Sequence, residues 1–204
     1  MGMGEPLLNY NSLLESISLI TTKKGLGISP KRITVSTAGI SKMIKKLADD
    51  KTRFNLAVSL HTAFNSKRDI LMPLNKKINL EELRDSIRYY YETTENRITY
   101  EYVLFKNFND SIEDAKKLVD FVKVSPCKIN LIDYNNVDNL PYEKSSDKTT
   151  NSFIKYLETQ NIIDELKKAI LMYIKNNKLN IKLDEDMWKK LLNEYKKNKN
   201  NNNV

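Results

Sequence analysis

The feature that most constrains the fold is a regular alternation between short β-type runs and segments with helical periodicity. β-Branched and apolar residues gather at 32–36, 54–60, 97–105 and 128–133, and amphipathic stretches lie between these runs. Strands that alternate with helices favour a parallel sheet joined by right-handed crossovers. The run 54–60 is mostly apolar, as in a strand covered on both faces. The sequence therefore predicts an α/β fold.

Helix starts are marked by capping signatures, in which an N-cap side chain and an acidic residue three positions later satisfy free backbone amides. The three signatures are Ser12 with Glu15, Asn79 with Glu82, and Ser111 with Asp114. We expect Gly25 to end the first of these helices. Apolar spacing predicts a further helix from residue 40 to 47, and others over 147–160, 162–176 and 184–197, with a loop over 134–146.

Polar residues follow the predicted strands at the points where the strands end. Ser36 follows the first, Ser59 and His61 the second, and Asn135 the last. In a (β/α) barrel the carboxyl ends of all strands meet at one mouth, where the site is built. A doubly wound open sheet is the alternative, and it also binds ligands at these ends.

The opening stretch combines glycine, a carboxylate and proline, which is typical of a sharp turn with exposed backbone amides. Glu5 can act there as a base, as a partner for an ammonium group, or as a simple turn residue. His61 is the one histidine, so it is either a hydrogen-bonding residue or an acid–base group, in a pair with Ser36 or Ser59. Cys127 is interpreted as a small buried side chain.

Composition excludes several classes of protein. One cysteine among 204 residues rules out a disulfide framework and a self-contained iron–sulfur or cysteine-rich zinc site, and it favours a reducing, cytoplasmic environment. No apolar run approaches the ~20 residues that a membrane span needs. The net charge of +8 is compatible with a nucleic-acid partner.

Six motifs together resemble the radical-SAM adenine-C2 RNA methyltransferases of the RlmN/Cfr type. They keep the family's order and spacing across residues 1–160. The motifs are Gly2-Met3-Gly4-Glu5-Pro6-Leu7-Leu8-Asn9, Arg32-Ile33-Thr34-Val35-Ser36-Thr37-Ala38-Gly39, Ala57-Val58-Ser59-Leu60-His61, Pro73-Leu74-Asn75-Lys76-Lys77, Ile98-Thr99-Tyr100-Glu101-Tyr102-Val103 and Pro126-Cys127-Lys128-Ile129-Asn130-Leu131-Ile132.

The resemblance implies an incomplete (β/α)6 partial barrel over residues 1–160 and a divergent helical, Lys/Asn-rich tail over 161–204. It implies a dual-specificity methyltransferase that uses S-adenosylmethionine and a [4Fe–4S] cluster to methylate adenine in ribosomal and transfer RNA. The cofactor-binding residues that it implies are Gly4, Glu5, Ser36, Ser59, Leu60, His61 and Asn135. Cys127 matches a position that is not catalytic.

The sequence also departs from the family pattern. The family's CxxxCxxC cluster motif and its second essential cysteine have no counterpart here, so we expect a truncated chain that is inactive alone and would need a companion N-terminal polypeptide to restore the cluster. One alternative is a non-catalytic remnant that binds RNA or S-adenosylmethionine, favoured by ten lysines against six acidic residues after Ile162. Another is an unrelated barrel enzyme that uses His61 and Glu5 for acid–base chemistry.

Overall fold

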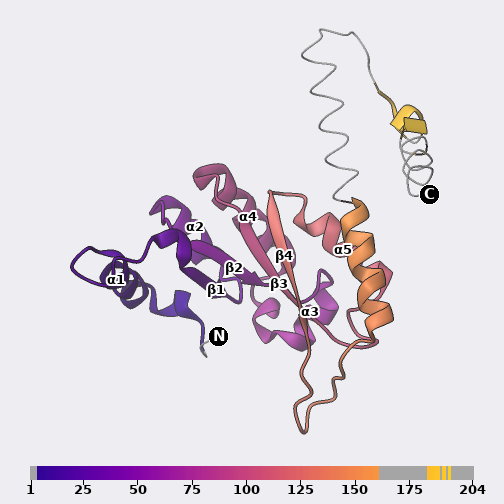
Figure 1. Cartoon of the computed structure of the whole chain (residues 1–204), viewed down its shortest axis with the longest axis horizontal. Coiled ribbons are helices and arrows are strands. Elements are labelled where there is room, and N and C mark those ends of the chain that lie inside the picture. The colour runs from indigo at the N-terminus through magenta and orange to yellow at the C-terminus, as the bar shows by residue number, and fades with distance from the viewer. Residues whose placement is uncertain (1–3, 161–182, 189, 192, 194–204) are drawn as a thin grey trace. The chain divides into compact units, whose positions relative to one another are not determined.

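The computed structural model describes residues 4–160, 183–188, 190, 191 and 193 (Figure 1). The helices are α1 (Tyr10–Thr21), α2 (Ser41–Asp49), α3 (Asn65–Leu71), α4 (Leu80–Thr94) and α5 (Ile112–Val122), the 3-10 turns are η1 (Pro6–Asn9), η2 (Pro30–Arg32) and η3 (Pro73–Lys76), and the strands are β1 (Thr34–Thr37), β2 (Asn55–Ser59), β3 (Ile98–Leu104) and β4 (Cys127–Asp133). A further helix covers 147–160. The chain forms two compact units, Met1–Ile154 and Lys155–Val204.

The four strands form one parallel sheet in the order β1-β2-β3-β4. The predicted parallel α/β fold is therefore confirmed. Each strand lies beside the next one in the sequence, so the order never reverses within the described sheet. A doubly wound sheet requires such a reversal, and the observed order is that of a barrel wall.

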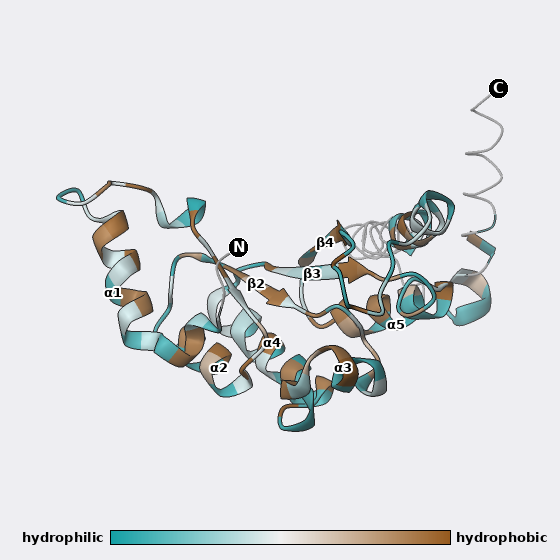
Figure 2. Cartoon of the chain, turned by 90° about the horizontal axis from the view of Figure 1, so that it is seen from below, coloured by the Kyte–Doolittle hydropathy of each residue, from teal (hydrophilic) through white to brown (hydrophobic). Residues whose placement is uncertain are grey.

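The two faces of the sheet differ in chemistry. Figure 2 shows α2, α4 and α5 on one side of the strands. Alternate strand residues point to that side, and those of β2 and β3 are almost fully buried: Leu56, Val58, Ile98, Tyr100, Tyr102 and Leu104. The helices meet them with apolar residues that are 0% exposed: Ile44, Leu47, Leu83, Ile87 and Leu118. The opposite face carries Ser36, Ser59 and Glu101, so it is polar where a barrel interior would hold a ligand.

Two of the three predicted helix starts are confirmed. The Asn79 side chain accepts a hydrogen bond from the Glu82 amide at 2.9 Å, and Ser111 forms a full capping box with Asp114. The prediction for Ser12 is wrong, because Ser12 lies inside α1. The turn η1 that starts at Pro6 leads directly into the helix, so no cap is needed at Ser12. The same helix ends at Thr21, before Gly25.

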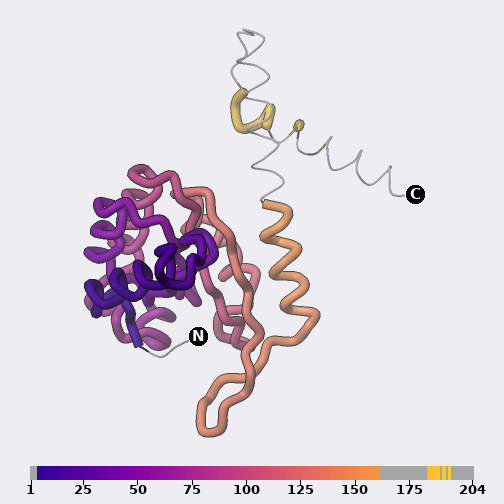
Figure 3. The backbone as a smooth tube through the Cα atoms, turned by 60° about the vertical axis from the view of Figure 1, so that its left-hand side comes forward, coloured from indigo at the N-terminus to yellow at the C-terminus, as the bar shows by residue number. Residues whose placement is uncertain are grey.

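Some predictions for the second half of the chain are confirmed and others fall outside the described residues. The segment 134–146 is a long loop that projects beyond β4 before the helix over 147–160 begins (Figure 3). The helix predicted over 162–176 lies outside the described residues. Within 184–197, the described residues between 185 and 193 are helical. The division of the chain into a barrel over 1–160 and a tail over 161–204 stays a prediction.

The short helix α3 was not predicted, because its seven residues carry no clear apolar period. Within the described residues, no helix combines the length and the apolar character that crossing a membrane requires.

Candidate functional site

The Glu5 carboxylate is bound to the exit turn of β1. Its Oε1 atom accepts hydrogen bonds from the Thr37 hydroxyl at 2.8 Å and the Leu7 amide at 3.1 Å, and its Oε2 atom accepts one from the Ala38 amide at 2.6 Å. A carboxylate has about four lone-pair positions, so one acceptor position on Oε2 stays available for an ammonium group. The preceding Gly4 has φ +100° and is exposed, which fits the predicted glycine turn.

Arg68, on α3, ties together the ends of β1 and β2. Its guanidinium is 0% exposed and donates to the Ala38 carbonyl at 2.7 Å, the Ser59 carbonyl at 3.3 Å and the Leu60 carbonyl at 3.4 Å. It also donates to the Asn75 side chain at 3.0 Å. Burial lowers the pKa of Arg68 to about 10, opposed by the charge of Asp69, so the group stays cationic at neutral pH.

Glu101, on β3, is the other polar centre of this edge. Its carboxylate accepts a hydrogen bond from the Ser36 hydroxyl at 3.1 Å, although the two residues lie on strands separated by β2. Its backbone carbonyl accepts hydrogen bonds from the amides of Leu60 at 3.0 Å and His61 at 3.2 Å. A carboxylate that is only 8% exposed and faces the polar side of the sheet is placed to hold Ser36 in one orientation.

His61 has a fixed tautomer in this arrangement. Its Nδ1 atom accepts a hydrogen bond from the Val103 amide at 3.1 Å, so the ring proton lies on Nε2. Burial, together with the charge of Arg68, lowers the pKa of His61 to about 4. The ring is therefore neutral at physiological pH and can donate from Nε2 to a ligand. It is poorly suited to acid–base catalysis at neutral pH. The Ser36 hydroxyl donates to Glu101, so in this structure it does not form the Ser–His pair that the sequence left open.

We expect the lowered pKa of His61 to appear as a pH dependence of stability. Between pH 6.5 and about 4 the unfolded chain binds a proton at this ring and the folded chain does not. The contribution of His61 to the free energy of unfolding is therefore fully present above pH 6.5 and is lost as the pH falls toward 4. From pH 7 to pH 5 the free energy of unfolding should decrease by about 1–2 kcal/mol through His61, as measured by urea unfolding.

The matched variant for this measurement is His61→Asn. Asparagine tolerates the backbone φ of +57° at this position, and its side-chain oxygen can accept the Val103 amide as Nδ1 does. It does not titrate, so its free energy of unfolding should decrease less than that of the native chain over the same pH interval. An equal decrease in both proteins would show that His61 is not the group responsible.

The remaining predicted residues are placed less closely. Ser59 ends β2 and is half-buried on the polar face, and the buried Leu60 follows it. Asn135 is exposed in the loop after β4, at the same edge of the sheet, and in the described part of the chain it makes no hydrogen bond with the other predicted residues. The structure therefore brings Glu5, Ser36, Ser59, Leu60 and His61 together. Asn135 lies at the same edge of the sheet but has no hydrogen bond to them in the described residues.

Cys127 does not have the properties of a reactive thiol or a cluster ligand. It starts β4, is half-buried, and burial raises its pKa to about 11. Such a thiol is protonated at neutral pH and is a weak nucleophile and metal ligand. In the described residues, no group of three or more His, Cys, Asp or Glu side chains could hold a metal ion. An iron–sulfur cluster needs several thiolates, so these residues do not fit one.

Three further residues shape the site and were not among the predicted site residues. Arg68, Asn75 and Asn109 are all buried and all bond to strand-end backbone or to one another. The Asn109 side chain donates to the His61 carbonyl at 2.6 Å, which fixes the left-handed backbone there. Asn75 lies in the motif Pro73-Leu74-Asn75-Lys76-Lys77, but the hydrogen-bond acceptors of Arg68 could not be predicted from that motif.

Comparison with known proteins identifies several relatives. The chain is 51% identical over 169 residues to the probable dual-specificity RNA methyltransferase RlmN of Flavobacterium psychrophilum, a match that covers 83% of this chain and 49% of the relative. The protein of the same name from Christiangramia forsetii is 48% identical, with 83% and 48% covered. No family model matches the sequence.

Solved structures agree with these relatives. A radical SAM methyltransferase from Sphaerobacter thermophilus has a TM-score of 0.75 and 35% identity, and the match covers 78% of this chain and 46% of that one. A domain of pyruvate-formate lyase-activating enzyme from Bacteroides vulgatus, at 17% identity and a TM-score of 0.58, shares the fold. The chain spans about half the length of the curated relatives that it matches. By sequence and fold, the chain is homologous to about half of the radical SAM RNA methyltransferases of the RlmN type.

Proposed function

We propose that the carboxyl ends of β1, β2 and β3 bind S-adenosylmethionine. The observation that supports this is the hydrogen-bond network that places Glu5, Ser36, Ser59, Leu60 and His61 at one edge of the sheet. Glu5 would accept a hydrogen bond from the ammonium group of the cofactor. The Nε2–H group of His61 would donate a hydrogen bond to an acceptor atom elsewhere on the cofactor. Gly4 would leave backbone amides open to its carboxylate, because nothing lies within 4 Å of a Cβ atom built there. Bound S-adenosylmethionine supplies the methyl group.

The relatives are named as dual-specificity RNA methyltransferases, and the reaction that we propose is therefore RNA methylation. The resemblance of the sequence motifs adds the target, which we propose to be C2 of adenine in ribosomal and transfer RNA. The one cysteine of the 204 residues cannot hold a [4Fe–4S] cluster. We therefore propose that these residues supply the cofactor-binding half of the site, and that cluster ligands would come from chain outside them, such as a separate N-terminal polypeptide. Both RNA classes are cytoplasmic, so we place the protein there.

Calorimetric titration of the purified chain with S-adenosylmethionine tests the proposal. We expect saturable binding, and we expect His61→Asn to weaken it about tenfold, since the variant keeps the acceptor for the Val103 amide but loses the Nε2 donor. Cys127→Ser is the control and should bind as the native chain does. An absence of binding by protein with a cooperative unfolding transition would contradict the proposal.

A cleavage assay on the same protein tests the proposal that the cluster ligands come from chain outside these residues. The chain alone is expected to bind S-adenosylmethionine without cleaving it when a reductant is added. Cleavage by the purified 204 residues would show that the cluster assignment is wrong. Binding of RNA without S-adenosylmethionine would favour the non-catalytic alternative.

A further inference from the structure

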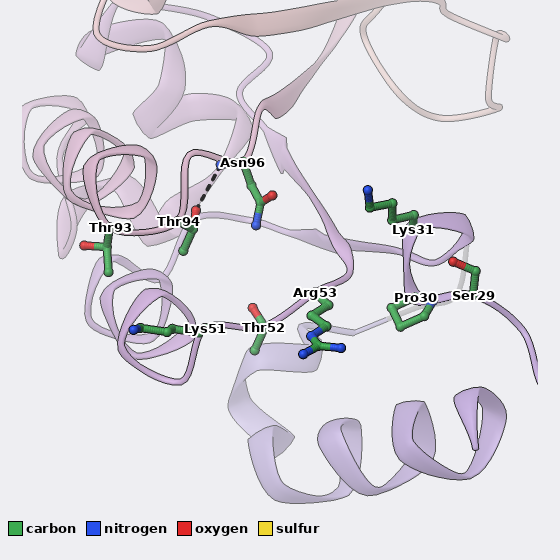
Figure 4. Close-up of a pocket in the computed structure, with 9 residues that line it drawn as sticks. All are labelled: Ser29, Pro30, Lys31, Lys51, Thr52, Arg53, Thr93, Thr94 and Asn96. Carbon is green, nitrogen blue, oxygen red and sulfur yellow. Dashed lines mark hydrogen bonds between the residues drawn. The ribbon is translucent and has the colours of Figure 1, made fainter. Parts of the chain in front are cut away.

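A polar pocket lies at the amino ends of β1, β2 and β3, which is the edge of the sheet opposite to the proposed cofactor site (Figure 4). Its volume is about 480 Å³. The segment before β1 contributes Lys31, the segment before β2 contributes Lys51, Thr52 and Arg53, and the end of α4 with the following turn contributes Thr94 and Asn96. Three segments that are distant in sequence therefore build one pocket.

The electrostatics of this pocket favour an anion. No acidic residue is among its described lining residues. The ion pairs of the described chain are all made by other residues, so Lys31, Lys51 and Arg53 have no ion-pair partner within that part of the molecule. Three uncompensated cations beside a concave surface produce a positive potential that attracts anions.

An apolar pocket of about 270 Å³ adjoins the polar one and shares Pro30, Lys51, Thr52 and Arg53 with it. Its apolar lining comes from Leu14 and Ile17 of α1 and from Phe54. A ligand that fills both pockets needs an anionic group joined to a flat or apolar group. Inorganic phosphate has only the first, and an apolar molecule only the second. A nucleotide has both.

We propose that this paired pocket binds a nucleotide, with its phosphate against Lys31, Lys51 and Arg53 and its base against Leu14, Ile17 and Phe54. The nucleotide can be free or part of an RNA strand, since the phosphate and the base are common to both. The site does not depend on the proposed function, because it uses none of the residues assigned to S-adenosylmethionine.

The test is an NMR titration of the whole ¹⁵N-labelled chain with adenosine 5′-monophosphate, adenosine, inorganic phosphate and a short single-stranded adenine oligonucleotide. We expect the monophosphate to shift the amide signals of residues 31, 51–53 and 94–96 in a saturable way. Arg53→Gln should weaken binding about tenfold, without loss of signal dispersion. Lys116→Gln removes an exposed cation of α5 and should have no effect.

Each outcome decides the proposal. Saturation by the monophosphate supports a free nucleotide, and saturation of the same signals by the oligonucleotide alone supports an RNA strand. If inorganic phosphate or adenosine binds as tightly as the monophosphate, the nucleotide assignment is wrong. If these signals do not shift with any ligand, or if Lys116→Gln weakens binding as much as Arg53→Gln, there is no nucleotide site here.

Discussion

Replacing Arg68 with methionine should lower the free energy of unfolding by about 4 kcal/mol. The substitution keeps a long side chain in the space but removes every donor. The carbonyls of Ala38, Ser59 and Leu60 then lose the guanidinium hydrogen bonds that join the ends of β1 and β2. Each buried acceptor left unpaired costs about 1–3 kcal/mol. The measurement is urea unfolding followed by circular dichroism.

Two further variants make this result specific. Arg68→Lys keeps the charge but cannot reproduce the fork of donors, so we expect an intermediate loss. Arg88→Met removes an exposed arginine whose partner is Asp85 on the same helix, and it should change stability by less than about 0.5 kcal/mol. If Arg68→Met lost no more than Arg88→Met, the strand ends would be held by other contacts and the role given to Arg68 would be wrong.

The second large effect concerns cofactor recognition by Glu5. Glu5→Gln should weaken binding of S-adenosylmethionine about thirtyfold, because a neutral amide cannot form the charge-assisted hydrogen bond to the ammonium group. The substitution also replaces one carboxylate oxygen by an amide donor. Because Oε1 and Oε2 both accept hydrogen bonds in the native chain, the variant loses one of these acceptors. Calorimetric titration gives the dissociation constant.

A second ligand separates recognition from a general loss of structure. 5′-Methylthioadenosine carries the nucleoside part of the cofactor but no amino acid part, so it never meets Glu5 in the proposed site. We expect its affinity to be the same for the native chain and for Glu5→Gln. Equal weakening for both ligands would mean that the substitution damages the exit turn of β1, through Thr37 and Ala38, and that the direct contact is unsupported.

The site could be predicted only in part from the sequence. The positions of Glu5, Ser36 and His61 after strands were sufficient to place them at one edge, because parallel strands share that edge. The chemistry assigned to His61 was less secure, since its low pKa depends on burial and on Arg68. The family resemblance extended the prediction to cofactor and substrate classes, and the relatives and the solved structures support the family.

Short-range patterns by themselves determined the elements of this protein. Apolar periodicity marked the strands and most helices, and the caps at Asn79 and Ser111 act over three residues, which a sequence shows directly. The tertiary structure alone decided which polar groups meet. Ser36 and Glu101 are 65 residues apart, Glu5 and Ala38 are 33 apart, and Arg68 and Ala38 are 30 apart. Contacts of that range depend on strand order and register, which only the packed sheet establishes.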